Sequence, residues 1–86
     1  MEAGLAIHDF LEYVVVKLID HPGEASVLHE MSGERHLYKI RLHPDDAGRV
    51  IGKGGKTISA IRSLAIASAQ LNGIRVDVEL DESGDR

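Results

Sequence analysis

The chain has 86 residues, enough for one domain with a single hydrophobic core. It contains no cysteine and no tryptophan, and its aromatic residues are Phe10, Tyr13 and Tyr38. These counts exclude a disulfide framework and a thiolate metal site, and they argue against an aromatic platform for stacking bases. The net charge is −4, which by itself disfavours binding to a polyanion.

The distribution of charge changes that conclusion. Residues 35–62 carry seven basic side chains against two acidic ones, a net charge of +5. Residues 1–34 have a net charge of −6 and residues 63–86 one of −3. Because nucleic-acid contacts are made by local basic patches, the middle of the chain is the candidate region for binding phosphates.

The first half of the chain predicts a helix and a hairpin. Apolar residues recur every three or four positions over 5–20, which indicates a helix. Residues 25–31 and 36–43 alternate between apolar and polar side chains, as strands with one buried face do. In the first of these strands, Val27 and Met31 are expected on the same face.

The second half predicts two helices and a strand. A short helix is expected over 45–51, with Asp45 and Asp46 at its N-terminus, where acidic side chains cap a helix and favour its dipole. A longer helix is expected over 56–72, where Ile58, Ile61, Ala65 and Leu71 recur at helical spacing. The last strand is expected over 75–80, and residues 82–86 form a polar tail.

This order, α-β-β-α-α-β, predicts an α+β fold. The second and third strands are joined through two helices, so a parallel pairing with a right-handed crossover is expected. The sequence therefore predicts a single domain over residues 1–81, built as a three-stranded mixed sheet with three helices on one face.

A glycine-rich loop connects the two later helices. Gly52, Gly54 and Gly55 lie within four positions; Lys53 lies between the first two, and Lys56 follows the last. Glycine allows a sharp turn and close approach by a ligand, and a helix that begins after the loop offers free N–H groups to an anion. The loop is therefore predicted to bind phosphate.

Two common phosphate-binding motifs do not fit the spacing. A nucleotide-binding P-loop ending at Gly55 needs a glycine five residues earlier, where Val50 stands. A dinucleotide fingerprint starting at Gly52 needs a glycine at the position of Thr57. What remains is a helix, a G-x-x-G loop and a second helix, the arrangement with which a KH module clamps the backbone of about four nucleotides.

The segment from Gly48 to Arg62 resembles a KH signature, and the element order is that of the type II KH fold. Together with Leu11-Glu12-Tyr13, Asp20-His21-Pro22 and the closing Val76–Leu80, it makes nearly the whole chain similar to the small stand-alone bacterial KH proteins of the KhpA family. The resemblance implies that the RNA loop is Gly52–Gly55. The candidate RNA-binding residues are Arg49, Val50, Ile51, Gly52, Lys53, Gly54, Gly55, Lys56, Thr57, Ile58, Ile61 and Arg62.

The resemblance further implies the biology of the family. Its members bind single-stranded RNA in the cytoplasm with little sequence preference, as RNA chaperones or post-transcriptional regulators that affect cell shape and envelope homeostasis. It also implies homodimers and a complex with a second KH protein, KhpB, also called Jag. No cofactor, metal site or membrane insertion is expected.

The residues also bear on two other function classes. A protein-interaction module with a vestigial glycine loop is the alternative, supported by the acidic N-terminal third and by the broad apolar stripe of the first helix. An enzyme is not expected, because Ser59, Ser63 and Ser68 lie on a helix without an evident base. The five histidines lack the spacing of metal ligands.

Overall fold

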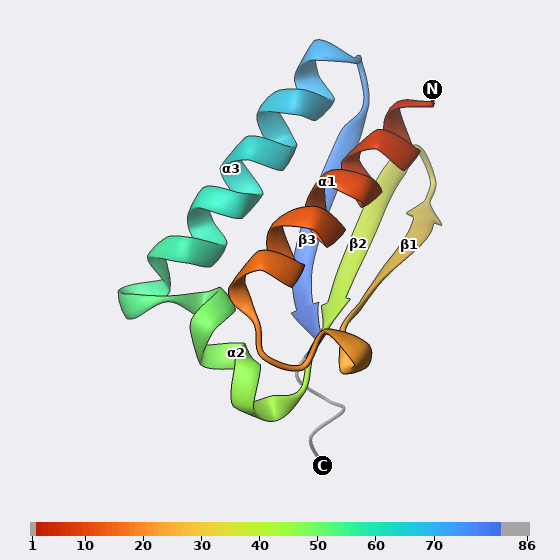
Figure 1. Cartoon of the computed structure of the whole chain (residues 1–86). Coiled ribbons are helices and arrows are strands. Elements are labelled where there is room, and N and C mark those ends of the chain that lie inside the picture. Colours follow the sequence, from red (N-terminus) through yellow and green to blue (C-terminus); the bar gives the residue numbers. More distant parts are fainter. Residues whose placement is uncertain (1, 82–86) are drawn as a thin grey trace.

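The computed structural model describes residues 2–81, and its elements follow the predicted order. They are α1 (Ala3–Leu18), β1 (Ser26–Ser32), β2 (Arg35–Arg41), α2 (Pro44–Ile51), α3 (Lys56–Leu71) and β3 (Arg75–Asp81), with 3-10 turns at Pro22–Glu24 and Lys53–Gly55 (Figure 1). Each boundary lies within two residues of the predicted one. The predicted polar tail, residues 82–86, lies outside the described residues.

The sheet has the order β1-β2-β3, with β2 in the centre. Strand β2 pairs antiparallel with β1 through a hairpin and parallel with β3 through the α2–α3 crossover. Helices α1 and α3 pack against the same face of this sheet, and α2 lies at its lower end in Figure 1. The predicted α+β architecture, a mixed three-stranded sheet with three helices, is confirmed.

The core lies between the helices and the sheet, with Tyr38 of β2 near its middle. The Tyr38 side chain is fully buried, and its hydroxyl donates a hydrogen bond to the Gly4 carbonyl of α1 at 2.7 Å. The other buried apolar residues come from all six elements: Ile7, Leu11, Val15, Val27, Ile40, Val50, Ile58, Ile61, Ala65, Ala69, Val76 and Val78. Burying these side chains is the main stabilising contribution to a domain of this size.

One expectation about the core was wrong. Leu71 of α3 is 89 % exposed, because the inward stripe of this helix continues from Ala65 to Ala69 and ends there. Val27 and Met31 lie four positions apart on β1 and share a face, as expected. Val27 is buried, whereas Met31 is 56 % exposed because it lies at the hairpin end of this edge strand. Within residues 2–81, no helix combines the length and the apolar character needed to cross a membrane.

Candidate nucleic-acid interface

The chain reverses direction between α2 and α3 through three glycines with positive φ angles. Gly54 and Gly55 have left-handed conformations, with φ of 64° and 77°. Gly52 has φ 77° and ψ 170°, a region open only to glycine. A Cβ atom on Gly52 would also lie 2.9 Å from the backbone nitrogen of Thr57, which is closer than real contacts allow. Only glycine fits at this position.

The loop leaves several backbone N–H groups open to an anion. The N–H groups of Gly55 and Lys56 already donate to the carbonyls of Gly52 and Lys53. In the described part of the chain, the N–H groups of Lys53 and Gly54 have no such partner. Helix α3 begins after Gly55 without a side-chain cap, so its N-terminal dipole is not neutralised by a carboxylate.

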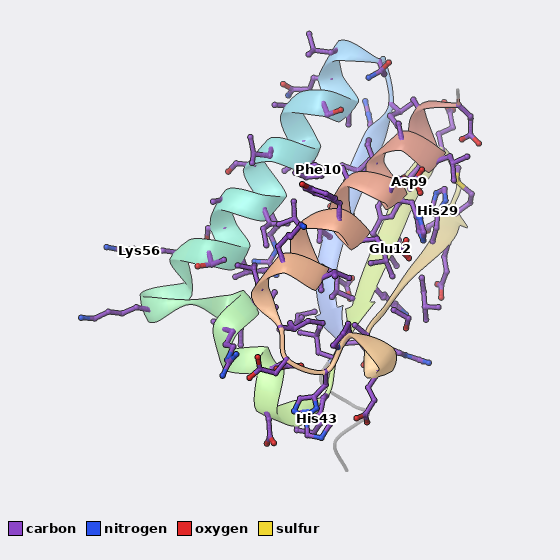
Figure 2. All side chains as sticks on the ribbon, viewed as in Figure 1. Asp9, Phe10, Glu12, His29, His43 and Lys56 are labelled. Carbon is purple, nitrogen blue, oxygen red and sulfur yellow. The ribbon has the colours of Figure 1, made fainter. Side chains whose placement is uncertain are left out.

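The four basic side chains predicted for the site form two groups, one without partners and one with partners. Lys53 and Lys56 are exposed, and no carboxylate of residues 2–81 lies within ion-pair distance of either ammonium group. Figure 2 shows Lys56 extending from the start of α3 away from the rest of the protein. Arg49 and Arg62, by contrast, are engaged: an Nη1 of Arg49 lies 2.7 Å from Oδ2 of Asp20, and Nε of Arg62 donates to the Val78 carbonyl at 3.0 Å.

The predicted apolar residues of the site support the loop from within. Val50, Ile58 and Ile61 are buried and belong to the core cluster. Ile51 and Thr57 are half-buried. Side chains of both helices that flank the loop are thus packed in the core. This packing fixes the end of α2 relative to the start of α3, while Lys53, Gly54 and Lys56 stay exposed.

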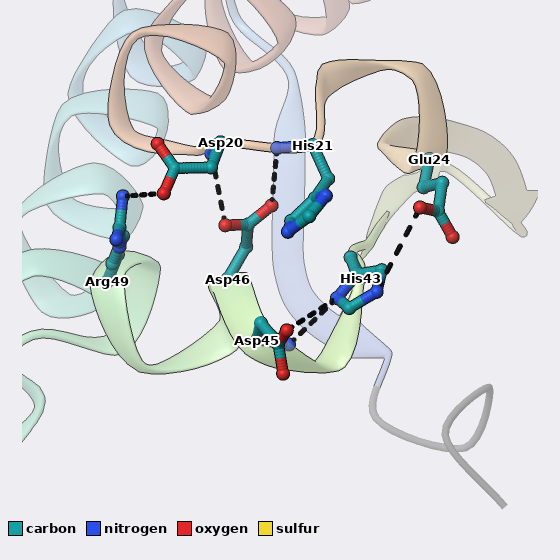
Figure 3. A network of polar contacts seen from close by, with 7 residues as sticks. All are labelled: Asp20, His21, Glu24, His43, Asp45, Asp46 and Arg49. Carbon is teal, nitrogen blue, oxygen red and sulfur yellow. Dashed lines mark hydrogen bonds and ion pairs between the residues drawn. The ribbon is translucent and has the colours of Figure 1, made fainter.

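A buried carboxylate fixes the position of α2. The two oxygens of Asp46 accept hydrogen bonds from the backbone N–H groups of Asp20 and His21, at 3.0 and 2.9 Å (Figure 3). Burial raises the pKa of this carboxyl, but the two hydrogen bonds and the nearby charges of His21 and Arg49 outweigh burial, so that the pKa of Asp46 lies below its ordinary value. Asp46 therefore ties α2 to the segment that follows α1.

Asp45 and Asp46 do not cap α2, contrary to expectation. The N-cap is His43, whose Nδ1 accepts the N–H of Asp45 at 3.0 Å (Figure 3). The sequence did carry one signal for this cap, because Pro44 is the kind of residue that occupies the first helical position. The contacts of Asp46 and Asp20 had no such signal, since they join segments about 25 residues apart.

Two groups of side chains among residues 2–81 have the donor types of a metal site. They are His21, His43 and Asp45, and His8, Asp9 and Glu12. The lone pair of His43 Nδ1 is already used by the helix cap, and the rings of His21 and His43 stack 4.0 Å apart. Both nitrogens of His8 also have partners, Val27 O and Asp9 Oδ1. Neither group includes a residue of the glycine loop.

Comparison with known proteins agrees with this geometry. The family model described as KhpA/KhpB, KH domain, matches residues 8–80. The chain is 41% identical over 70 residues to the RNA-binding protein KhpA of Mycobacterium leprae, covering 81% of this chain and 86% of that protein.

Two further relatives have the same printed name, RNA-binding protein KhpA. The protein of Leifsonia xyli subsp. xyli is 40% identical over 68 residues, 79% of this chain and 90% of the relative. The protein of Chlamydia caviae is 35% identical over 74 residues, 86% of this chain and 95% of the relative. The chain therefore belongs to the KhpA/KhpB family of KH domains.

Proposed function

We propose that the chain binds single-stranded RNA by holding backbone phosphates at the loop Gly52–Gly55. The observation that carries this proposal is the combination, within residues 2–81, of N–H groups of Lys53 and Gly54 without a partner, two ammonium groups without an ion-pair partner and a helix N-terminus without a side-chain cap. The names of the relatives, RNA-binding proteins, support it. Because backbone N–H groups and lysines contact phosphates rather than base edges, binding has low sequence specificity.

The predicted site residues have different roles in this proposal. Lys53 and Lys56 neutralise phosphates, and Gly52, Gly54 and Gly55 give the loop its shape. Arg49 contributes less, because Asp20 already compensates its charge. The loop is held in place by Val50, Ile51, Thr57, Ile58 and Ile61. Arg62 extends the basic surface along α3.

The test is a titration of a fluorescent RNA of about ten nucleotides, long enough for one KH site, at several salt concentrations. Neutralising two phosphates on a single strand predicts a slope of log K against log salt of about −1.4. Replacing Lys53 and Gly54 together by aspartate is expected to abolish binding. The fold should survive, because both positions are exposed and Asp tolerates the left-handed region of Gly54 better than most residues.

A matched control carries the same change of charge elsewhere. Lys17→Asp with Gly23→Asp alters two exposed positions outside the loop, and a Cβ at Gly23 meets open space. This variant should bind RNA like the wild type. Equal binding by the wild type and the Lys53/Gly54 variant, or an affinity that does not depend on salt, would contradict the proposal and favour a protein-interaction module.

We infer that the chain also forms a homodimer, as the family resemblance implies. Helix α3 supports this: Ala60, Leu64, Ala67 and Leu71 form an exposed apolar stripe at helical spacing, with Leu64 58 % and Leu71 89 % exposed. Sedimentation of the wild type is expected to give a dimer, and Leu64→Lys a monomer with unchanged helix content. A monomeric wild type would contradict this inference without affecting RNA binding.

The cellular role proposed here follows the same resemblance. The protein acts in the cytoplasm as an RNA chaperone or post-transcriptional regulator, in partnership with KhpB, and its loss alters cell shape and envelope homeostasis. The loop variant Lys53→Asp, Gly54→Asp should fail to restore normal shape to cells lacking the protein, whereas the control variant should restore it. Restoration by both would separate the cellular role from RNA binding.

A further inference from the structure

An ion pair lies beside the glycine loop and holds one of its predicted basic residues. Arg49 is in the last turn of α2, three residues before Gly52, so the start of the loop is about 4.5 Å further along the helix axis. Nη1 of Arg49 lies 2.7 Å from Oδ2 of Asp20, in the segment that follows α1 (Figure 3). Asp20 therefore compensates a positive charge within one helical turn of the proposed phosphate site.

The other basic residues of the site have no such competitor. Within residues 2–81, the ammonium groups of Lys53 and Lys56 have no ion-pair partner. Nε of Arg62 donates to the carbonyl of Val78, a neutral group that leaves the charge of the guanidinium available. Of these four basic residues, Arg49 is thus the one that a carboxylate of the described chain holds.

The fold places Asp20 where it meets Arg49. The backbone N–H of Asp20 donates to the buried carboxylate of Asp46 at 3.0 Å. Asp46 and Arg49 are three residues apart on α2, so they lie on the same side of this helix. One of them binds the backbone of Asp20 and the other binds its side chain. The anchor that fixes α2 therefore also brings the Asp20 carboxylate to Arg49.

The ion pair between Arg49 and Asp20 is weak enough for a phosphate to displace it. Both side chains are more than half exposed, 55 % for Arg49 and 61 % for Asp20. Exposed pairs of this kind change an equilibrium constant by a factor of about five at most. A guanidinium donates paired hydrogen bonds to a phosphate as it does to a carboxylate. Because a phosphate that binds Arg49 must first break the pair, the gain and the loss nearly cancel.

We propose that Asp20 competes with RNA phosphate for Arg49 and thereby limits the affinity of the glycine loop for RNA. The inference rests on the proposed function, because Arg49 can contact only a strand that is already held at Lys53 and Gly54. In the wild type, Lys53 and Lys56 neutralise two phosphates. Without the charge of Asp20, Arg49 becomes a third contact for the same strand.

The test is a double-mutant cycle in the titration of the RNA of about ten nucleotides. Asp20→Asn should bind this RNA about fivefold more tightly than the wild type at 0.1 M salt, and the slope of log K against log salt should steepen by about 0.7, the values for one phosphate contact. Arg49→Gln should bind almost like the wild type, because Asp20 already compensates the charge of Arg49. In the Arg49→Gln background, Asp20→Asn should bring no gain.

Glu24→Gln is the matched control, because it removes one exposed negative charge from the same segment between α1 and β1, where Glu24 lies 3.9 Å from His43 (Figure 3). This variant should bind RNA like the wild type.

Three results would overturn this inference while leaving the loop as the RNA site. An equal gain from Asp20→Asn with and without Arg49 would mean that Asp20 only repels RNA. An unchanged affinity of Asp20→Asn would mean that Arg49 does not reach a phosphate. A fivefold loss for Arg49→Gln in the presence of Asp20 would mean that the ion pair does not hold Arg49 back. A wild type that binds no RNA would overturn the proposed function and this inference together.

Discussion

Gly52 and Gly54 both have positive φ angles, but the space around them differs. A Cβ on Gly54 meets nothing within 4 Å, whereas one on Gly52 meets the side chain and the backbone nitrogen of Thr57. The conformation differs as well, since Gly54 is left-handed helical and Gly52 lies in the region that other residues hardly enter. Gly52 is therefore required by both its conformation and the space around it, whereas Gly54 is favoured by its conformation alone.

Alanine substitution should separate these two requirements. Gly52→Ala is expected to lower the free energy of unfolding by more than ~2 kcal/mol, from backbone strain and the contact with Thr57. Gly54→Ala should cost about 1 kcal/mol, the usual penalty of a left-handed conformation. Urea unfolding followed by circular dichroism measures both. Equal losses would show that the packing of Thr57 against Gly52 does not contribute.

The sequence predicted the conformations of the loop glycines but not the hydrogen-bond partners of Asp46. The positive φ at Gly52, Gly54 and Gly55 follows from residue type, because a tight loop between helices needs such conformations. The partners of Asp46 depend on where the segment after α1 passes. Position along the chain carries no information about that contact, and the local reading of Asp46 as a cap was therefore wrong.

At the scale of elements, α2 is short and is held mainly by its ends. It has eight residues, too few to be stable alone, and Val50 and Asp46 are its buried residues. Asp46 connects it to the backbone after α1, and Val50 places it in the core. Because the glycine loop begins where α2 ends, these two anchors also determine the position of the loop.

Replacing Asp46 by asparagine tests the polar anchor. The asparagine amide keeps the shape of the carboxylate, but its NH₂ group is a donor that faces a backbone N–H. The midpoint temperature of thermal unfolding should therefore fall clearly. Asp45→Asn is the matched control, with the same loss of charge at an exposed neighbouring position, and it should change the midpoint little. Equal midpoints of the two variants would contradict the anchoring role.

The same pair of variants predicts a dependence on pH. The pKa of Asp46 lies below its ordinary value of 3.8 in the folded state. Its contribution to stability is therefore fully present above the unfolded pKa and is lost as the pH falls through the folded one. The wild type should lose stability below pH 3.8 more steeply than Asp46→Asn, and parallel acid-unfolding curves would rule this out.

At the scale of the whole molecule, the order of elements determined most of the architecture. Two strands joined by a turn pair antiparallel, and strands joined through two helices pair in parallel, so the sheet order followed from connection rules. How far each apolar stripe is covered depended on packing. Leu5 and Val16 of α1 remain 47 % and 44 % exposed, because the sheet covers only the side of α1 centred on Leu11.

Tyr38 links α1 to the centre of the sheet, and its titration reports on that contact. Burial raises the pKa of Tyr38, with the charge of Glu2 adding to the effect, from 10.0 to about 12. Because the folded pKa is the higher one, this contribution to stability is fully present below pH 10 and is lost as the pH rises toward 12.

The Tyr13→Phe variant leaves Tyr38 as the single tyrosine in a chain without tryptophan. Its near-ultraviolet absorbance should show ionisation at about pH 12 in the folded protein and near pH 10 when the variant is unfolded in urea. Tyr38→Phe should lower the free energy of unfolding by about 1 kcal/mol, the value of one hydrogen bond, and should abolish the alkaline loss of stability. Ionisation at pH 10 in the folded variant would mean that the Tyr38 hydroxyl is open to water and that α1 is not fixed to β2 through Gly4.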